Sequence, residues 1–290
     1  MRKDYALSAS FLERNHFLFR RLHSLTGLVP IGVFLIAHLV TNSSLAWGGF
    51  ALRGEKPGIG VQDGGAYYFN KEVTWINEQV PHLLLIEITL WGAIAFHSIL
   101  GVYYATTGKA NTDRYSYQDN WRYRLQRISG YLGIVFIFYH VATLRWGWTF
   151  LMPGGVAWDH KFAASTLNHA LTGGGIGWDL GLGLLYFVGV SMLVFHFANG
   201  VWTAAITWGL TVSAKAQKRW GVVCFGLGVM LMAMAWMSII GAMALDYEKT
   251  KAMESGRTSR ADSIIISIPH SIHVPLTKSE ADQMRTKAKQ

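Results

Sequence analysis

Five long apolar stretches divide the 290-residue chain, with polar segments before, between and after them. Each stretch is about as long as the ~20 residues that an α-helix needs to cross the hydrocarbon core of a bilayer. Backbone polar groups in lipid have no water to pair with, so such stretches are expected to be helices. The pattern predicts an all-α integral membrane protein with five transmembrane helices, at about residues 25–47, 82–106, 128–151, 180–206 and 221–245.

Composition agrees with a membrane domain at residues 1–245 and a polar C-terminal tail at residues 246–290. Only 15% of the residues are charged and 51% are hydrophobic, whereas a soluble domain carries roughly a quarter of charged residues. Residues 1–24 are polar, and the first apolar stretch is too long for the core of a secretory signal, so no cleavable signal is expected. The single Cys224 excludes disulfides and Cys-ligated zinc or iron–sulfur centres within the chain.

The formal charge of +9 is concentrated in alternate loops. The positive-inside rule therefore predicts a protein of the cytoplasmic membrane with a cytoplasmic N-terminus, and five helices then place the C-terminus on the opposite side. The positive charges of Lys249 and Lys251, near the start of the tail, disagree with this orientation. The distribution indicates a lipid bilayer as the partner and no nucleic acid. The basic clusters are Arg2, Lys3, Arg14, Arg20 and Arg21; Lys109, Arg114, Arg122, Arg124 and Arg127; and Lys215, Lys218 and Arg219.

Each of the first four predicted helices carries one histidine deep in its apolar stretch: His38, His97, His140 and His196. An ionisable side chain in the hydrocarbon region is costly and is a functional candidate by default. With the predicted orientation and helix rise, His38 and His140 both lie about 20–25 Å from the inner surface. His97 and His196 lie about 24–25 Å from the outer surface. The sequence thus predicts an outer and an inner pair, joined across a bundle of the first four helices.

Paired imidazoles in a helix bundle indicate two b-type haems. Two neutral imidazoles on one iron leave no open position, which favours electron transfer over oxygen chemistry. The chain has no Cys-x-x-Cys-His motif, which excludes covalent c-type attachment. Gly101 and Gly200 follow His97 and His196 by four residues and leave room for a porphyrin on the same helix face. For any single histidine, a hydrogen-bonded packing role is the alternative interpretation.

Short motifs accompany the four histidines in a fixed order along about residues 16–245. They lie at 19–25, 34–38, 97 with 101–103, 115–117, 120–121, 125–127 with 129–130, 140, 195–197, 199–200, 202 and 207–209. In this order they resemble the di-haem cytochrome b558 membrane-anchor subunits of succinate:menaquinone oxidoreductases, the succinate dehydrogenase or fumarate reductase complexes. The long outer loops and the tail extend beyond the usual compact subunit, and their role is left open.

The resemblance implies partners and a path for electrons. A flavoprotein subunit with FAD oxidises succinate, and an iron–sulfur subunit passes the electrons to the cytoplasmic face of the anchor. The inner haem, with His97 and His196 as iron ligands, receives them. The outer haem, with His38 and His140, passes them to menaquinone. The candidates for contact with the haem propionates are Arg21, His23, Ser24 and Arg127, for which ordinary positive-inside charge or an interface position is the alternative.

Glu87 is the candidate for quinone chemistry. It lies ten residues before His97 on the second predicted helix, roughly 9 Å inside the outer surface by helix rise. A carboxyl group near the outer haem could exchange protons as a quinone changes redox state. The alternative is a carboxyl group hydrogen-bonded to a neighbouring helix. Val194 occupies the position where the family has another device, a glutamate two residues before the fourth ligand, so that device is missing.

Two other functions remain open at this point. The chain could be a di-haem cytochrome b that anchors another oxidoreductase, such as a hydrogenase or a formate dehydrogenase. It could also be a haem-free transporter whose histidines relay protons. Five predicted helices without an inverted repeat argue against the transporter.

Overall fold

A computed structural model describes residues 11–52, 60–108, 120–152, 155–173 and 179–258, and these residues form helices without any strand. Five helical segments are long and apolar enough to cross a membrane. The predicted fold class, an all-α membrane protein with five spanning helices, is thereby confirmed; the di-haem bundle stays a prediction. The five segments are His16–Ala51, α6 (Leu83–Thr107), α7 (Asn120–Leu144), α9 (Asp179–Thr207) and α10 (Ala214–Met243).

The first membrane segment is built from three pieces. They are α3 (His16–Thr26), the π-helical turn η1 (Gly27–Ile31) and α4 (Gly32–Ala51), and the short α2 (Phe11–Arg14) precedes them. Pro30 lies inside η1, and because proline has no backbone N–H, it disturbs the regular α-helical hydrogen bonds there. The wider turn changes which residues of α3 and α4 share a helix face.

The end of α7 differs from the predicted stretch of 128–151. The helix ends at Leu144, and Gly147 then adopts a left-handed conformation with φ of +68°. Glycine takes this conformation without strain, so the chain can turn back at this point. The apolar residues after Gly147 belong to the short turn η3 (Thr149–Leu151) and not to a membrane helix.

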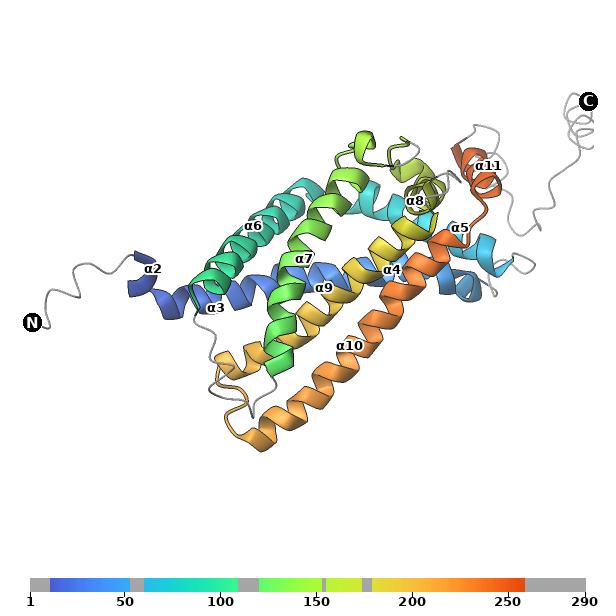
Figure 1. Ribbon diagram of the computed structural model, residues 1–290. Helices are drawn as coiled ribbons and strands as arrows, with labels where there is room; N and C mark the ends of the chain where they lie inside the picture. The colour runs from blue at the N-terminus through green and yellow to red at the C-terminus, as the bar shows by residue number, and fades with distance from the viewer. Residues whose placement is uncertain (1–10, 53–59, 109–119, 153–154, 174–178, 259–290) are drawn as a thin grey trace, which may run out of the picture.

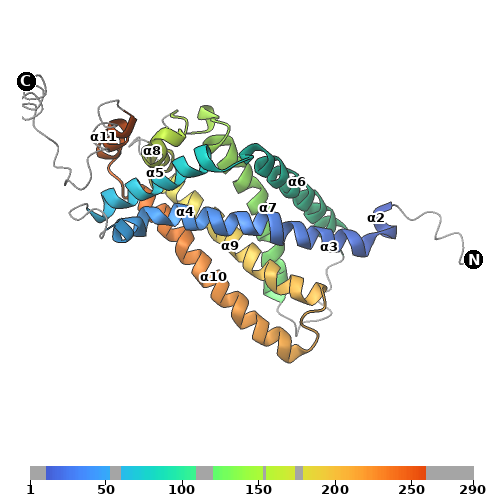
Figure 2. The ribbon, with the colours of Figure 1, turned by 180° about the vertical axis from the view of Figure 1, so that it is seen from behind.

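The spanning helices pack in a bundle (Figures 1 and 2). α7 packs against α9, α9 against α10, and α10 against α4, while α6 packs against α3 and η1. α6 and α7 meet at one end of the bundle and diverge toward the other. We call the end where they meet the cap end, and the opposite end, where α9 is followed by α10, the basic end.

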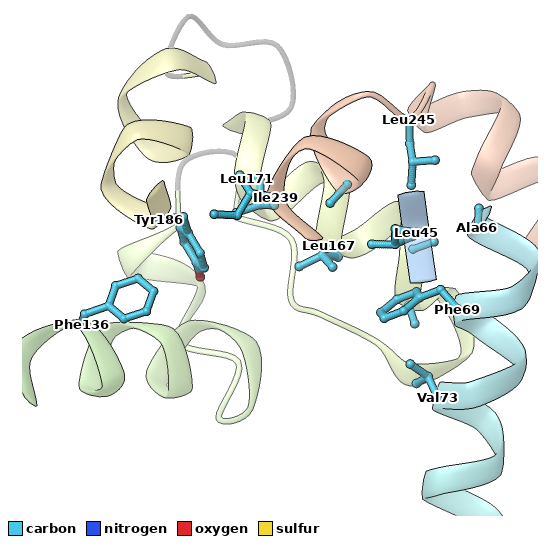
Figure 3. Close-up of a cluster of buried hydrophobic side chains, with 13 residues drawn as sticks. Leu45, Ala66, Phe69, Val73, Phe136, Leu167, Leu171, Tyr186, Ile239 and Leu245 are labelled. Atoms are coloured by element: carbon cyan, nitrogen blue, oxygen red, sulfur yellow. The ribbon is translucent and has the colours of Figure 1, made fainter. Parts of the chain in front are cut away.

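Three further helices cover the cap end: α5 (Val61–Gln79), α8 (Ala163–Thr172, preceded by the turn η4 at His160–Phe162) and α11 (Tyr247–Thr258). These helices were not predicted from the sequence; they occupy the two long loops that were predicted to lie on the outer side, and the start of the tail. We call them the cap. Their apolar side chains share a buried cluster with the bundle (Figure 3), including Leu45, Phe69, Phe136, Leu167, Leu171, Tyr186, Ile239 and Leu245.

Buried polar contacts fix the cap helices to one another. Glu254 of α11 is fully buried, and its carboxylate accepts hydrogen bonds from the backbone N–H groups of Ala164 (2.9 Å) and Ser165 (3.3 Å) and from the Ser165 hydroxyl. These N–H groups belong to the first turn of α8, where a negative charge is stabilising. Asn70 of α5 accepts a second, longer hydrogen bond from Ala164 N–H at 3.3 Å.

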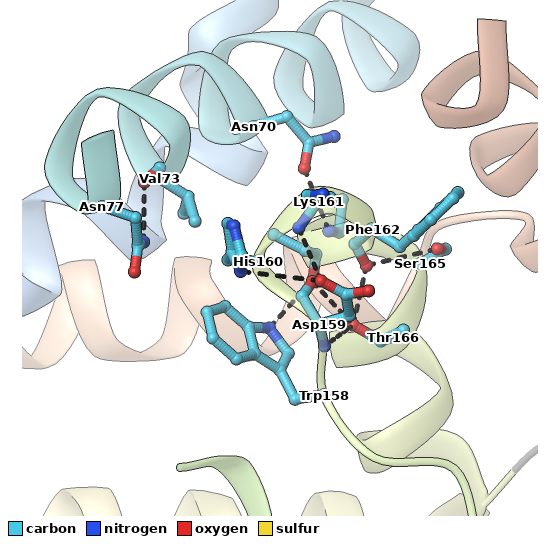
Figure 4. A network of polar contacts seen from close by, with 12 residues as sticks. Asn70, Val73, Asn77, Trp158, Asp159, His160, Lys161, Phe162, Ser165 and Thr166 are labelled. Atoms are coloured by element: carbon cyan, nitrogen blue, oxygen red, sulfur yellow. Dashed lines mark hydrogen bonds and ion pairs between the residues drawn. The ribbon is translucent and has the colours of Figure 1, made fainter. Parts of the chain in front are cut away.

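The chain segment that leads into α8 is held by its own polar network (Figure 4). The Thr166 hydroxyl donates to the Phe162 carbonyl at 2.7 Å, and the Asp159 N–H donates to Thr166 Oγ1 at 3.1 Å. On the surface, Lys249 of α11 donates to Asp63 of α5 at 2.8 Å, and this carboxylate raises the pKa of the lysine. The cap is therefore one packed unit at the end of the bundle, and the first residues of the tail belong to it.

Candidate cofactor-binding site

A large cavity among the described residues runs through the bundle and is lined by all four candidate histidines. Its volume is about 2210 Å³, and its wall is formed by the first membrane segment, α6, α7, α9 and α10, with residues of α5 and α8 at the cap end. An ordinary ligand pocket measures about 300–1,000 Å³. The cavity therefore has room for more than one large cofactor.

His38 of α4 and His140 of α7 face each other toward the cap end. Their ring centroids lie 5.8 Å apart, and the ring planes are inclined by 85°. Phe34 stacks on His38 at 5.3 Å, and Phe136 stacks on His140 at 5.9 Å. The amide nitrogen of Asn42 lies 3.4 Å from His38 Nδ1. The sequence predicted this pairing from depth alone, and the structure brings the two rings together.

His97 of α6 and His196 of α9 face each other toward the basic end. Their ring centroids lie 6.1 Å apart, at an angle of 83°. His97 Nδ1 lies 2.9 Å from the His23 carbonyl oxygen, and His196 Nδ1 lies 3.1 Å from the Gln126 carbonyl oxygen. A carbonyl oxygen only accepts hydrogen bonds, so both Nδ1 atoms carry the proton. In each neutral ring, Nε2 is then the nitrogen with a free lone pair, as metal binding requires.

The ring spacing fits a shared metal ion. An imidazole nitrogen binds a metal at about 2 Å, and the ring centre lies about 1 Å further away, so two imidazoles on one metal have centres roughly 6 Å apart. Both observed spacings, 5.8 and 6.1 Å, are close to this value. Among the described residues there is no cluster of three or more His, Cys, Asp or Glu side chains that could hold a metal. Two-histidine ligation, with the remaining positions supplied by a porphyrin, needs no such cluster.

Two further glycines lie against the basic-end rings. A Cβ atom on Gly27 would lie 2.6 Å from His97 Cε1, and one on Gly130 would lie 3.1 Å from His196 Cε1. Gly101 and Gly200 line the cavity, as their predicted packing role requires. A Cβ atom on Gly101 would meet His23 at 3.3 Å, whereas on Gly200 the nearest atom would be 3.9 Å away. Sequence reasoning missed Gly27 because η1 breaks the helical spacing.

The candidates for contact with the haem propionates differ in whether they line the cavity. His23, Ser24 and Arg127 line the cavity, and so does Arg20, whereas Arg21 is not among the described lining residues. The Arg21 guanidinium instead lies 5.7 Å from the centre of the Trp208 ring. The structure favours Arg20 over Arg21 for contact with a cofactor.

Two further basic-end cations lie beside aromatic rings. Arg127 donates to the Tyr123 hydroxyl at 2.8 Å. Arg122, which also lines the cavity, donates to Asn199 Oδ1 at 3.0 Å and lies 4.1 Å from the centre of the Trp202 ring. A cation that rests on an aromatic face keeps its place and can still turn donors toward an anionic group.

Glu87 lines the cavity at the cap end and forms an ion pair. Arg145 Nη2, just beyond the end of α7, donates to Glu87 Oε1 at 2.6 Å. The sequence left two interpretations of Glu87 open, a quinone-site residue or a carboxyl group hydrogen-bonded to a neighbouring helix. The contact with Arg145 agrees with the second, because Arg145 follows directly on α7. It leaves a role in quinone chemistry untested. In the sequence, Arg145 is merely one of the few charges of an outer loop, so its contact with Glu87 could not be predicted.

Comparison with known proteins gives one informative match. The chain is 34% identical over 211 residues to the succinate dehydrogenase cytochrome b558 subunit of Bacillus subtilis (strain 168). The match covers 70% of this chain and 85% of that protein. No protein-family model and no solved structure matches the chain. The resemblance inferred from the histidine motifs is thereby confirmed.

Proposed function

Because the chain belongs to the family of succinate dehydrogenase cytochrome b558 subunits, we propose that it anchors a succinate:quinone oxidoreductase to the membrane and carries its electrons through two b-type haems. The observation that carries this proposal is the presence of two facing histidine pairs, one toward each end of a single cavity. His38 and His140 hold one haem iron, and His97 and His196 hold the other.

Haem, when bound, supplies one-electron transfer, because two imidazoles leave no open position for oxygen. The chain keeps the ligand rings in place. The carbonyl groups of His23 and Gln126 bind the Nδ1 atoms of His97 and His196, which fixes both the ring orientation and the tautomer. Gly27 and Gly130 let neighbouring backbone approach these two rings closely. Arg20, His23, Ser24 and Arg127 supply donors for carboxylates at the basic end.

The basic end faces the cytoplasm in this proposal, and the subunit lies in the cytoplasmic membrane. Its lysines and arginines follow the positive-inside rule and suit the docking of an iron–sulfur subunit. That subunit receives electrons from a flavoprotein subunit in which FAD oxidises succinate. His97 and His196 would hold the haem nearest to this partner, His38 and His140 would hold the haem nearest to the menaquinone site, and the two haems would supply one-electron transfer between these ends.

The quinone reacts near the cap end, and Glu87 exchanges a proton with it. Within the described cavity lining Glu87 is the only carboxyl group, and a carboxyl group close to a quinone oxygen can act as a general acid once it has taken up a proton. Reduction of the quinone to the quinol takes up two electrons, which would come from the succinate-oxidising partner subunits, and two protons.

An optical measurement tests the proposal. A reduced-minus-oxidised spectrum of the purified complex should show b-type bands with two haems per chain, and succinate should reduce both. A chain without a b-type signal would instead be a haem-free transporter. Co-purification with a hydrogenase or formate dehydrogenase subunit, without succinate oxidation, would identify an anchor for another oxidoreductase.

A further inference from the structure

The Glu87–Arg145 ion pair lies in the wall between the cavity and the membrane. Both side chains line the cavity, yet Arg145 is 51% and Glu87 27% exposed. On the first turns of α6, Leu84 and Leu85 are 70% and 62% exposed, as expected of side chains that face lipid. The ion pair is therefore reachable from the cavity, and it lies about one helical turn from side chains that suit contact with lipid.

A pair of tryptophans joins the same two segments. Trp91 follows Glu87 by one helical turn, so the two side chains share a face of α6. Trp146 follows Arg145 directly, and the Trp91 and Trp146 ring centroids lie 5.6 Å apart at 33°. Gly147, with its left-handed backbone, turns the chain immediately afterwards. We call these four side chains, Glu87, Trp91, Arg145 and Trp146, the seam group, because they connect α6 to the end of α7.

Within the described cavity lining, Glu87 and Arg145 of the seam group are the only acidic or basic side chains other than histidine at the cap end. α5 and α8 place apolar side chains on the cavity from the cap side, among them Phe69, Val73 and Leu167. These side chains separate the cap-end histidines from water beyond the cap. Among the described lining residues, Arg145 is the only lysine or arginine outside the basic end, since the others are Arg20, Arg122, Arg127 and Lys218. A lipid-soluble molecule that comes from the membrane therefore meets its first ionised groups at the seam group.

Given the proposed reduction of a quinone at the cap end, we propose that Arg145 binds this quinone, by donating a hydrogen bond from its guanidinium group to one of the two carbonyl oxygens. The guanidinium group has five N–H donors in a fixed plane, and the contact with Glu87 joins only Nη2 to Oε1. Arg145 can thus hold Glu87 and the quinone together. The flat indole of Trp91, which lines the cavity and contacts Trp146, offers a face against which a quinone ring can stack.

In this arrangement Arg145 and Glu87 have different roles, binding and proton transfer. Arg145 binds and orients the carbonyl oxygen, and no bond is made or broken at its guanidinium group. Glu87, which forms the ion pair with Arg145, takes up a proton from water and passes it to the oxygen of the reduced quinone. Loss of Arg145 should therefore weaken quinone binding, whereas loss of the Glu87 carboxyl group should slow turnover of quinone that is already bound.

The test uses the purified complex with 2,3-dimethyl-1,4-naphthoquinone as the acceptor. Arg145→Gln should raise KM for this quinone about tenfold or more, as expected for the loss of a charged hydrogen bond, and should change kcat less than twofold. Arg145→Lys keeps the charge but not the planar fork, and should give an intermediate KM. Lys161→Gln removes an exposed cation of the cap that does not line the cavity, and should change neither constant.

Two controls make the outcome decisive. Reduction of a dye by the flavoprotein subunit and the content of two haems should be unchanged in every variant. If Arg145→Gln loses haem, the KM comparison is made with Arg145→Lys, provided that this variant keeps both haems. An unchanged KM, or a loss confined to kcat as in Glu87→Gln, would overturn the assignment of Arg145 and leave the proposed function standing. Failure of the unaltered complex to reduce the quinone, with normal dye reduction, would instead refute the proposed function.

Discussion

The imidazole of His23 lies flat against that of His97, with ring centroids 4.0 Å apart and planes inclined by 12°. The backbone carbonyl of the same His23 accepts the hydrogen bond from His97 Nδ1 at 2.9 Å. One residue of α3 thus fixes both the plane and the tautomer of a ring on α6. It also places a second imidazole beside the proposed ligand, which affects how the ligand assignment is best tested.

His196→Ala should remove the basic-end haem and leave the cap-end haem bound. Among the described residues the ring that His196 contacts is that of His97, the other proposed ligand, and the His23 ring stacks on His97. A haem:chain ratio of one, measured from the pyridine haemochrome, is expected. Succinate should no longer reduce the remaining haem, while dithionite still does.

His97→Ala should have the same effect, but here His23 could take over the iron. The double variant His97→Ala/His23→Ala removes that substitute, so it should bind one haem whatever the single variant does. Two haems per chain in the double variant, or in His196→Ala, would contradict the assignment of these ligands.

Gly27→Ala should lower the occupancy of the basic-end haem without touching a ligand. The added Cβ atom would lie 2.6 Å from His97 Cε1, closer than carbon atoms can approach, so the ring or η1 must shift. A partial loss of haem and a shifted midpoint potential for the haem that remains are expected, measured by redox titration of the optical spectrum.

Gly92→Ala is the matched control for Gly27→Ala. It lies on α6, and a Cβ atom there would meet nothing within 4 Å. Alanine is favoured over glycine in a helix by about 0.5–1 kcal/mol, so this variant should keep both haems and both potentials. Equal effects of the two substitutions would show that the contact between Gly27 and His97 is unimportant.

The spanning helices and the histidine pairs could be predicted because each depends on local features. An apolar run of sufficient length becomes a helix in lipid whatever its partners are. Constant helix rise then converts sequence position into depth, which brought His38 to the level of His140 and His97 to that of His196. The observed ring spacings follow from those depths and from the packing of α7 against α9 and of α6 against the first membrane segment.

The cap and the seam group could not be predicted because they depend on contacts between distant residues. α8 begins where Glu254, far along the chain, caps its first turn. Arg145 meets Glu87 only because Gly147 ends α7 at the level of the first turns of α6. Gly27 was missed for a different reason. The π-helical turn changes the residue spacing along the helix, so the regular α-helical spacing does not predict which residues share a face with Gly27.

Glu87→Gln should slow quinone reduction while both haems stay bound. Glutamine keeps an acceptor for Arg145 but has no acidic proton, and loss of a general acid lowers the rate by about a hundredfold or more. Steady-state kinetics with the soluble naphthoquinone should show the change in kcat, and succinate-driven dye reduction should be normal. Glu78→Gln, a carboxylate of α5 outside the described cavity lining, is the control. Unchanged quinone kinetics in Glu87→Gln would remove this residue from the site.

Glu254→Ala should loosen the cap and expose the cap end of the cavity. Its carboxylate is fully buried, and without it the N–H groups of Ala164 and Ser165 lose their shortest contacts. Loss of buried hydrogen bonds to a charged group, together with the space left behind, should cost about 2–4 kcal/mol. Hydrogen exchange of α8 and α11 should become faster, and the cap-end haem should be lost at a lower temperature than in the unaltered protein.

The matched control for this prediction is Glu248→Ala, which removes an exposed carboxylate from the same helix. Glu254→Gln is also informative, because its amide keeps one acceptor oxygen but turns donors toward N–H groups that also donate. It should lie between the control and Glu254→Ala. If instead Glu254→Ala leaves hydrogen exchange and the haem-loss temperature at the values of Glu248→Ala, the carboxylate is not what holds α11 to α8. The apolar contacts shared by Leu167, Leu171 and Leu245 would then be sufficient to keep the cap in place.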